Sequence, residues 1–286
     1  MYKNSDYTIS LVPFENDYLF SKWGINSILI SNFIPYEYYD IKPSDLSSNT
    51  ILMIGRGDDK TKRFDLGIKA MKHVISEIYN SELKIISSLN NIYYLFKLTK
   101  DLNLDNFVKF VGYTSKPEMY YKNASIHLFP TLVESFGNVL TETKIHGIPN
   151  VLVGLDYVAC SHGGTVIIYD DSPLSLANVI IKILKNKRYR KKLGRDARHS
   201  MKKFRNNLIL KRWVKIILAI YKGKEYYQKL RNEDKKLSEK DSIKLIENQL
   251  NLLKSRNSKF KNISLKDVIN FSFMENLTWF FKIGYI

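Results

Sequence analysis

The sequence predicts an α/β protein built on a Rossmann-like, doubly wound parallel sheet, and two observations lead to that fold class. Between residues 50 and 186, short apolar runs alternate with longer stretches of helical periodicity, which is the pattern of repeated β-α-β units. The runs are rich in Val, Ile and Leu, as strands buried on both faces are. With 286 residues, 44% of them hydrophobic and 26% charged, the chain can bury such a core.

The expected strands and helices follow one another in order along this region. Strands are expected at 51–55, 83–87, 108–112, 125–129, 150–154 and 165–169. Helices are expected between and after them, at 65–79, 89–102, 116–123, 138–146 and 173–185. The first helix is the most regular, because Leu66, Ala70 and Val74 fall on one face. Ligands of such sheets bind at the carboxyl ends of the strands, so we look for a site there.

Four regions follow from the composition. Residues 1–45 hold a strand, a helix, a strand and a linker. This is too little for a domain, so we interpret it as the remnant of a larger N-terminal one. Residues 46–186 are the sheet domain, basic helices follow at 187–224, and a Lys- and Asn-rich helical tail follows at 225–286.

Positive charge is concentrated in one stretch. The formal net charge is +17, and residues 182–215 hold 15 Lys and Arg against one Asp, a net +14. Such a block points to an anionic partner. An anionic membrane surface and a plain solvated face are equally favoured. The membrane is considered because apolar residues recur at helical spacing beside the charge: Tyr189, Leu193, Ala197, Met201 and Phe204. Nucleic acid is the least favoured partner, because the sequence contains no recognition motif for it.

Cysteine content and hydropathy favour a cytoplasmic protein, peripheral at a membrane if the basic stretch binds one. Cys160 is the only cysteine, so an intrachain disulfide is excluded. No apolar run is long enough to span a bilayer, and the N-terminus lacks the features of a signal peptide. The histidines show no metal-ligand spacing, and no Asp-x-Asp pair occurs. We therefore expect neither a metal nor a cofactor.

The segment ESFGNVLTETKIHGIP, residues 134–149, places two carboxylates eight positions apart. We expect Asn138 to be the N-cap of a helix that ends at Gly147. Glu134 then lies in the loop above the carboxyl end of a strand. Glu142 lies about one turn inside the helix and faces the same cleft.

This arrangement suits a nucleotide sugar. The backbone N–H groups of Phe136, Gly137 and Asn138 would converge at the helix N-terminus, where the helix dipole favours a phosphate. A carboxylate accepts two hydrogen bonds at once, so Glu142 suits the cis diol of a ribose and Glu134 suits sugar hydroxyls.

Two cations complete the expected site. Arg56 comes directly at the carboxyl end of the first strand, and Lys62 comes just before the next helix. Both could reach a diphosphate, Arg56 with a fork of donors and Lys62 as a point charge.

Commonplace interpretations of the same residues stay open. Instead of binding a ligand, Arg56 could cap a helix or pair with Asp58 or Asp59. Acids such as Glu134 and Glu142, taken alone, are more often solvated. His127 lies inside an expected buried strand, so we interpret it as a core histidine rather than a catalytic one.

Three segments in order resemble a known family: GRGDDKTKRFDLGIKAM, VKFVGYT and YYKNASIHLFPTLVESFGNVLTETKIHGIP. Together they are similar to the nucleotide-sugar-binding, C-terminal domain of a family 4 retaining GT-B glycosyltransferase, over roughly residues 50–185. The resemblance implies that Arg56 and Lys62 contact the diphosphate, Glu134 the donor sugar and Glu142 the ribose. It places the rest of the donor site at Ser135, Phe136, Gly137 and Asn138, and the base near Gly112 and Tyr113.

The resemblance also implies an activity. A sugar would pass from a nucleotide diphosphate sugar, with UDP-sugar favoured, to a lipid-linked or glycan acceptor with retention of configuration and without a metal. Most of the family's N-terminal acceptor domain is missing, so a partner chain would supply it. The chain departs from the family at 87–91, where a glycine-rich turn is common, and at Ser135 and Thr143. The alternative is a catalytically inactive Rossmann-domain module that binds a membrane surface or a partner protein.

Overall fold

The computed structural model describes residues 8–25 and 27–223, and then residues 240, 244, 247, 248, 251 and 254. The helical tail expected at 225–286 otherwise lies outside the described residues. The chain divides into two compact units. The larger unit consists of Glu37–Asp156 and Cys160–Lys202, and the smaller one contains the chain up to Tyr36, Tyr157–Ala159 and the residues from Lys203 onward.

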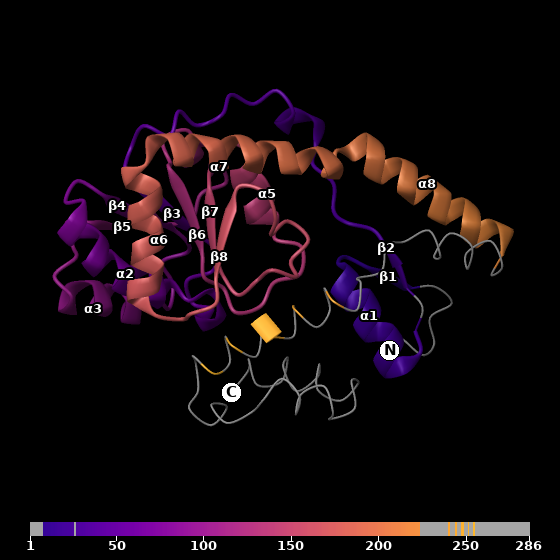
Figure 1. Ribbon diagram of the computed structural model, residues 1–286, viewed down its shortest axis with the longest axis horizontal. Helices are drawn as coiled ribbons and strands as arrows, with labels where there is room; N and C mark the ends of the chain where they lie inside the picture. Colours follow the sequence, from indigo (N-terminus) through magenta and orange to yellow (C-terminus); the bar gives the residue numbers. More distant parts are fainter. Residues whose placement is uncertain are drawn as a thin grey trace. The chain divides into compact units, whose positions relative to one another are not determined.

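The larger unit is built on a six-stranded parallel sheet (Figure 1). Its strands are β3 (Thr50–Ile54), β4 (Glu82–Ile86), β5 (Val108–Phe110), β6 (Ile126–Phe129), β7 (Asn150–Val153) and β8 (Thr165–Ile168). They lie in the order β5-β4-β3-β6-β7-β8, and every neighbouring pair is parallel. This is the order of a doubly wound Rossmann-like sheet, so the predicted fold class is confirmed.

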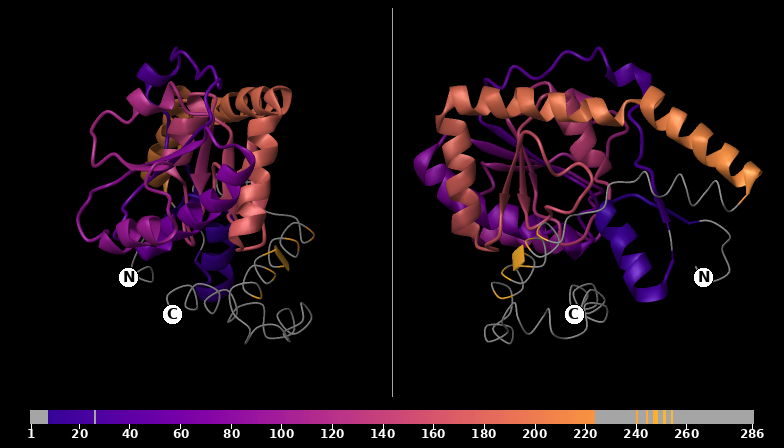
Figure 2. Two further views of the ribbon diagram at one scale, coloured as in Figure 1. Left: turned by 90° about the vertical axis from the view of Figure 1, so that its left-hand side faces the viewer. Right: turned by 45° about the vertical axis from the view of Figure 1, so that its right-hand side comes forward.

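Helices lie on both sides of this sheet (Figure 2). They are α2 (Phe64–Glu77), α3 (Tyr93–Asp101), α4 (Glu118–Tyr121), α5 (Asn138–Ile145), α6 (Pro173–Lys185) and α7 (Lys187–Ser200). Short 3-10 turns are η2 (Tyr36–Tyr38), η3 (Lys60–Lys62) and η4 (Met201–Phe204). Helix α2 packs against α3 and α6, and α5 packs against α7.

Burial of the strands depends on their place in the sheet. Every residue of β6 and β7 is buried, and so are the first four of β3. In contrast, all four residues of β8 are only partly buried, and β5 exposes Lys109. Both are edge strands. The expectation that all six strands are buried on both faces is therefore wrong for the two edges.

The order in which the chain adds strands to the sheet changes direction between β3 and β6. These two strands are neighbours, with Ile51 opposite Ile126 and Leu52 opposite His127. From β3 the chain moves outward to β4 and β5, then crosses back to β6 and continues to β7 and β8. Connections at such a point leave on opposite sides, so a crevice forms at the carboxyl ends of the two strands.

The smaller unit contains the strand, helix and strand that were expected near the start of the chain, so this prediction is confirmed. They are β1 (Thr8–Ser10), α1 (Pro13–Trp23) and β2 (Ser27–Leu29), and the two strands pair in parallel. Helix α8 (Asn206–Lys222) packs on them through Ile216 and Ala219, which contact the buried Ile28 and Ile30. The remaining faces of α8 expose apolar side chains, namely Leu208, Leu210, Trp213, Val214, Ile217, Leu218, Ile220 and Tyr221.

Helix α7 uses its apolar stripe inside the protein. Leu193 and Ala197 are buried, and so are Met201 and Phe204 beyond the helix end, while Tyr189 is partly buried. These apolar side chains therefore pack inside the protein and do not support membrane binding. In the part of the chain that the structure describes, no helix is both long and apolar enough to cross a bilayer.

Candidate functional site

A cleft of about 430 Å³ opens in the larger unit at the carboxyl ends of β3, β4 and β6. It is lined by Ile54, Gly55, Arg56, Lys62, Ile86, Ser87, Ser88, Tyr113, Thr114, Pro117, Phe129, Glu134, Asn138 and Val139. Half of the predicted site residues are in this lining: Arg56, Lys62, Tyr113, Glu134 and Asn138. The other half are outside it: Gly112, Ser135, Phe136, Gly137 and Glu142.

The loop after β3 carries both predicted cations. Arg56 is largely exposed, and its Nη2 lies 3.1 Å from Oδ2 of Asp59, so the pairing considered from the sequence is present. The other carboxylate oxygen of Asp59 accepts hydrogen bonds from the backbone N–H of Thr61 at 3.0 Å and from its hydroxyl at 2.6 Å. Asp59 is thereby the N-cap of η3, which fixes the turn that leads to Lys62.

Lys62 faces Glu134 across the cleft. The Nζ of Lys62 lies 3.6 Å from Oε2 of Glu134, and the two side chains are 19% and 26% exposed. The same ammonium lies 5.9 Å from the centre of the Phe129 ring, within the range of a cation–π contact. The cleft therefore holds a partly buried cation beside an acceptor of hydrogen bonds.

The start of α5 forms another wall. The helix begins at Asn138, and its N-cap is Gly137 with φ of 82°, so the prediction that Asn138 is the N-cap is wrong by one residue. A side chain at Gly137 would meet Leu140 Cδ1 at 2.8 Å as well as being strained at this φ. Phe136 is buried, and the backbone N–H of Ser135 donates to Oε1 of Glu134 at 3.1 Å.

Glu142 lies outside the lining of the cleft and has a protein partner instead. Its Oε2 accepts a hydrogen bond of 2.7 Å from the hydroxyl of Tyr121, on α4. Burial raises the pKa of the Glu142 carboxyl, and the hydrogen bond from Tyr121 opposes that rise. Burial, and then the contact with Glu142, raise the pKa of the Tyr121 hydroxyl. Glu142 was expected to face the same cleft as Glu134 and is not among the residues that line it, and its partner Tyr121 was not predicted.

The loops after β4 and β5 close the side of the cleft away from α5. Ser87 and Ser88 line it, and the Ser87 hydroxyl accepts from the backbone N–H of Gly57 at 2.6 Å. Tyr113 is 82% exposed, so its ring is accessible to a ligand. Both serines belong to the segment 87–91, where the chain departs from the family it resembles, and neither was predicted as a site residue.

His127 is a core residue, as expected. It is fully buried, and its Nδ1 lies 2.6 Å from Oδ1 of Asn150 and 3.2 Å from the hydroxyl of Thr143. Burial lowers the pKa of His127 to about 4. The ring is therefore neutral at physiological pH.

Comparison with known proteins identifies the family. The family described as "Glycosyl transferases group 1" matches residues 37–200, which is more than half of the chain. The chain belongs to this family.

Two curated relatives carry glycosyltransferase names. The capsular polysaccharide biosynthesis glycosyltransferase CapM of Staphylococcus aureus is 31% identical over 153 residues, which are 50% of this chain and 39% of CapM. An uncharacterized glycosyltransferase of Haemophilus influenzae is 29% identical over 110 residues, which are 38% of this chain and 31% of the relative. This chain thus spans about two fifths or less of the length of these relatives.

Solved glycosyltransferase structures share the fold. TarM of S. aureus, in a complex that includes UDP, superposes with a TM-score of 0.67 at 22% identity, covering 74% of this chain and 44% of TarM. Anabaena HepE, in complex with UDP and glucose, gives a TM-score of 0.66 at 16% identity, covering 76% of this chain and 64% of HepE. At these identities the likeness shows the GT-B type of fold.

The cleft lies at the carboxyl ends of the strands, where a fold of this type binds its ligands. Among the described residues, no cluster of three or more His, Cys, Asp or Glu side chains could hold a metal ion.

Proposed function

We propose that this chain is the nucleotide-sugar-binding, C-terminal part of a retaining group 1 glycosyltransferase and that its donor is a nucleotide diphosphate sugar. The observation that carries the proposal is the opposition of Lys62 and Glu134, 3.6 Å apart in a cleft at the carboxyl ends of β3 and β6. A cation for phosphate and an acceptor for hydroxyls are the two groups that such a donor requires. Complexes of TarM and HepE contain UDP, which supports a UDP-sugar.

In this proposal the cleft residues divide the donor between them. Arg56 and Lys62 bind the diphosphate, together with the backbone N–H groups at residues 136–138 at the start of α5. Glu134 accepts hydrogen bonds from the sugar. The loop at Gly112 and Tyr113 receives the base. Glu142 takes the ribose diol, which requires that its bond to Tyr121 be shared or exchanged on binding.

The reaction would proceed on one face of the sugar. The acceptor hydroxyl attacks the anomeric carbon from the side on which the diphosphate leaves. A new glycosidic bond forms, the bond from the anomeric carbon to the phosphate oxygen breaks, and the leaving phosphate takes the hydroxyl proton. Arg56 and Lys62 stabilise the charge on the departing diphosphate without a metal.

The acceptor half would come from sequence outside this chain, either from an N-terminal part of the same polypeptide or from a partner chain. Two observations support this. The chain covers only 39% of CapM, and the smaller unit, in the part that the structure describes, has a two-stranded sheet, which is marginal on its own. Reading the coding DNA directly upstream would separate the two sources.

An anionic membrane surface is a further proposed partner, since α7 exposes basic side chains on its outer face: Lys187, Arg188, Lys191, Lys192 and Arg195. Binding of this kind depends on charge. It predicts that the protein sediments with vesicles containing anionic lipid and is released by salt.

The test of the donor site is calorimetric. UDP, GDP, ADP and the corresponding glucose conjugates are titrated into the purified chain, and the titrations are repeated with Lys62→Ala. Binding of one nucleotide diphosphate, weakened about 10- to 100-fold in the variant, is the expected result for a lost charge-assisted contact. Absence of binding to a well-folded chain would reject the proposal and favour a non-catalytic binding module.

A further inference from the structure

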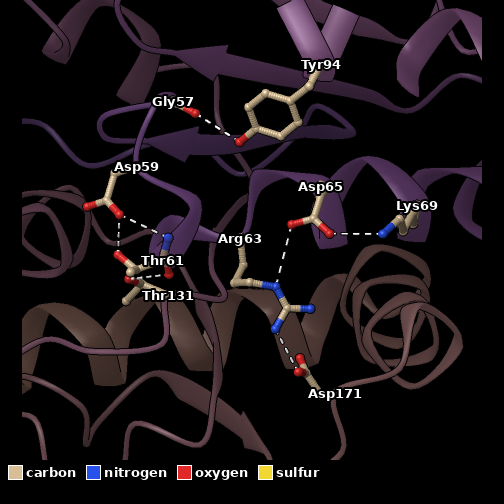
Figure 3. A network of polar contacts seen from close by, with 9 residues as sticks. All are labelled: Gly57, Asp59, Thr61, Arg63, Asp65, Lys69, Tyr94, Thr131 and Asp171. Carbon is tan, nitrogen blue, oxygen red and sulfur yellow. Dashed lines mark hydrogen bonds and ion pairs between the residues drawn. The ribbon is translucent and has the colours of Figure 1, made fainter. Parts of the chain in front are cut away.

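Lys62 is held between two anchored neighbours in the loop after β3. On its N-terminal side, the carbonyl of Thr61 accepts a hydrogen bond of 3.1 Å from the hydroxyl of Thr131 (Figure 3). It also accepts one of 2.8 Å from the backbone N–H of Leu132. Both donors belong to the loop after β6. The loop that carries Lys62 is thereby bound to the loop that leads to Glu134.

On the C-terminal side, Arg63 makes a second anchor. Its Nη1 donates to Oδ2 of Asp171 at 2.7 Å, and its Nε lies 3.5 Å from Oδ1 of Asp65 (Figure 3). Asp171 is only 7% exposed and lies between β8 and α6. Asp65 is held in turn by Lys69 at 2.9 Å. The guanidinium therefore ties the loop to the start of a different helix.

The backbone of Arg63 is in an unusual conformation. Its φ of 53° is left-handed, and the residue ends η3 and is the N-cap of α2. Three other described residues with side chains have such a φ, and two of them are Asn, which tolerates it: Leu46, Asn91 and Asn103. Arg63 has neither this tolerance nor the freedom of glycine. Its ion pairs with Asp65 and Asp171 offset the cost of this backbone conformation.

The two lysines of η3 line different surfaces of the larger unit. Lys62 lines the cleft, whereas Lys60, two residues earlier, lines a groove on another side together with Arg63 and Asp65. If the turn relaxed, the ammonium of Lys62 would leave its position opposite Glu134.

We propose that Arg63, through its left-handed turn and its ion pair with Asp171, is a positioning residue that holds Lys62 in the donor cleft. The inference rests on the proposed function, because it assumes that Lys62 binds a diphosphate. Arg63 does not line the cleft and acts through its neighbour.

The test uses Arg63→Gly, which permits the left-handed turn but removes the guanidinium, and Asp171→Asn, which removes the charge of the partner. Affinities for UDP and UMP are measured by calorimetry on the full chain, in the wild-type and Lys62→Ala backgrounds. We expect Arg63→Gly and Asp171→Asn to weaken UDP about 10-fold and to leave UMP unchanged, since the second phosphate is the proposed contact. In the Lys62→Ala background they should cause no further loss. Lys60→Ala is the control on the same loop and should bind as the wild type.

Several outcomes would overturn the proposal: full UDP affinity in Arg63→Gly, an equal loss for UMP, a loss that persists in the Lys62→Ala background, or a loss of equal size in Lys60→Ala. If the wild type binds neither nucleotide, the proposed function fails separately. The anchor is then judged by hydrogen exchange of residues 58–63. Faster exchange in Arg63→Gly and Asp171→Asn supports it, and unchanged exchange rejects it.

Discussion

The ammonium of Lys62 lies 3.6 Å from the carboxylate of Glu134, although the two residues come from loops after different strands. Those strands, β3 and β6, are neighbours only because the sheet is doubly wound. The side chain of Lys62 is about four-fifths buried and that of Glu134 about three-quarters buried. Each charge is therefore stabilised by the other until a ligand binds. In the proposed function a phosphate replaces the carboxylate at Lys62, which frees Glu134 for sugar hydroxyls.

Glu134→Gln should separate recognition of the sugar from recognition of the nucleotide. UDP should bind at least as tightly as to the wild type, because the carboxylate no longer competes for Lys62. The extra affinity for UDP-glucose over UDP should fall about 10-fold or more, since a hydrogen bond to a charged acceptor is worth about 1.5–3 kcal/mol. Calorimetry with both ligands measures the difference. Glu118→Gln, a change outside the cleft lining, serves as the control, and weaker UDP binding in Glu134→Gln would contradict the assignment.

Glu142→Gln should make the protein more stable near neutral pH. Because burial raises the pKa of Glu142 in the folded state, the folded chain holds this proton at a pH where the unfolded chain has lost it. Stability therefore falls as the pH rises above the ordinary pKa of 4.5 toward the raised value. The glutamine variant lacks this loss, and its amide oxygen can still accept from Tyr121. Thermal unfolding of both proteins from pH 4 to pH 8 tests this, and a variant that is less stable at pH 7.5 would reject the argument.

The strands and the cleft could be predicted because they depend on local pattern and on the direction of the sheet. Apolar runs bounded by glycine or proline identify strands, and parallel strands bring their carboxyl ends to one edge. This is why Lys62 and Glu134 could be placed at the same edge of the sheet from the sequence alone, although their ion pair was not predicted. The exposure of β5 and β8 could not be predicted in the same way, since it follows from strand order.

Contacts between side chains of different segments could not be predicted from the sequence. Tyr121 reaches Glu142 from α4, a helix of one turn, and nothing in either segment indicates the pairing. Lysine is rarely buried, yet Lys144 is fully buried and its Nζ donates to the carbonyls of Cys160 and His162. Such partners depend on how a helix is rotated against its neighbours.

His127→Gln should remove part of the acid sensitivity of the fold. The pKa of His127 is lowered from 6.5 to about 4, so between these values the unfolded chain binds a proton that the folded chain excludes. This contribution to stability is present above pH 6.5 and is lost as the pH falls. The loss from pH 7.5 to pH 5.0 is on the order of 2 kcal/mol.

Glutamine does not titrate and can still donate to Asn150, so the variant isolates the proton. Urea midpoints at pH 7.5 and pH 5.0 are compared for both proteins. The wild type should lose more stability than His127→Gln on acidification. An equal loss in both would show that other groups carry the acid sensitivity.

Gly164→Ala should destabilise the protein by more than the cost of its left-handed backbone conformation. The added methyl group would overlap α7, which is part of the core of the larger unit. Gly164 has φ of 65°, and a methyl group there would overlap the backbone nitrogen of Ala197 and the carbonyl of Leu193. Gly24 is the matched control, since its φ is 64° and nothing lies within 4 Å of an added methyl group. The left-handed conformation alone costs about 1–2 kcal/mol in Gly24→Ala, whereas overpacking against α7 adds about 1–3 kcal/mol in Gly164→Ala. Calorimetric unfolding resolves the two units if they melt separately. Equal losses in the two variants would mean that α7 is not packed against this turn, and its apolar stripe would again be available to a membrane.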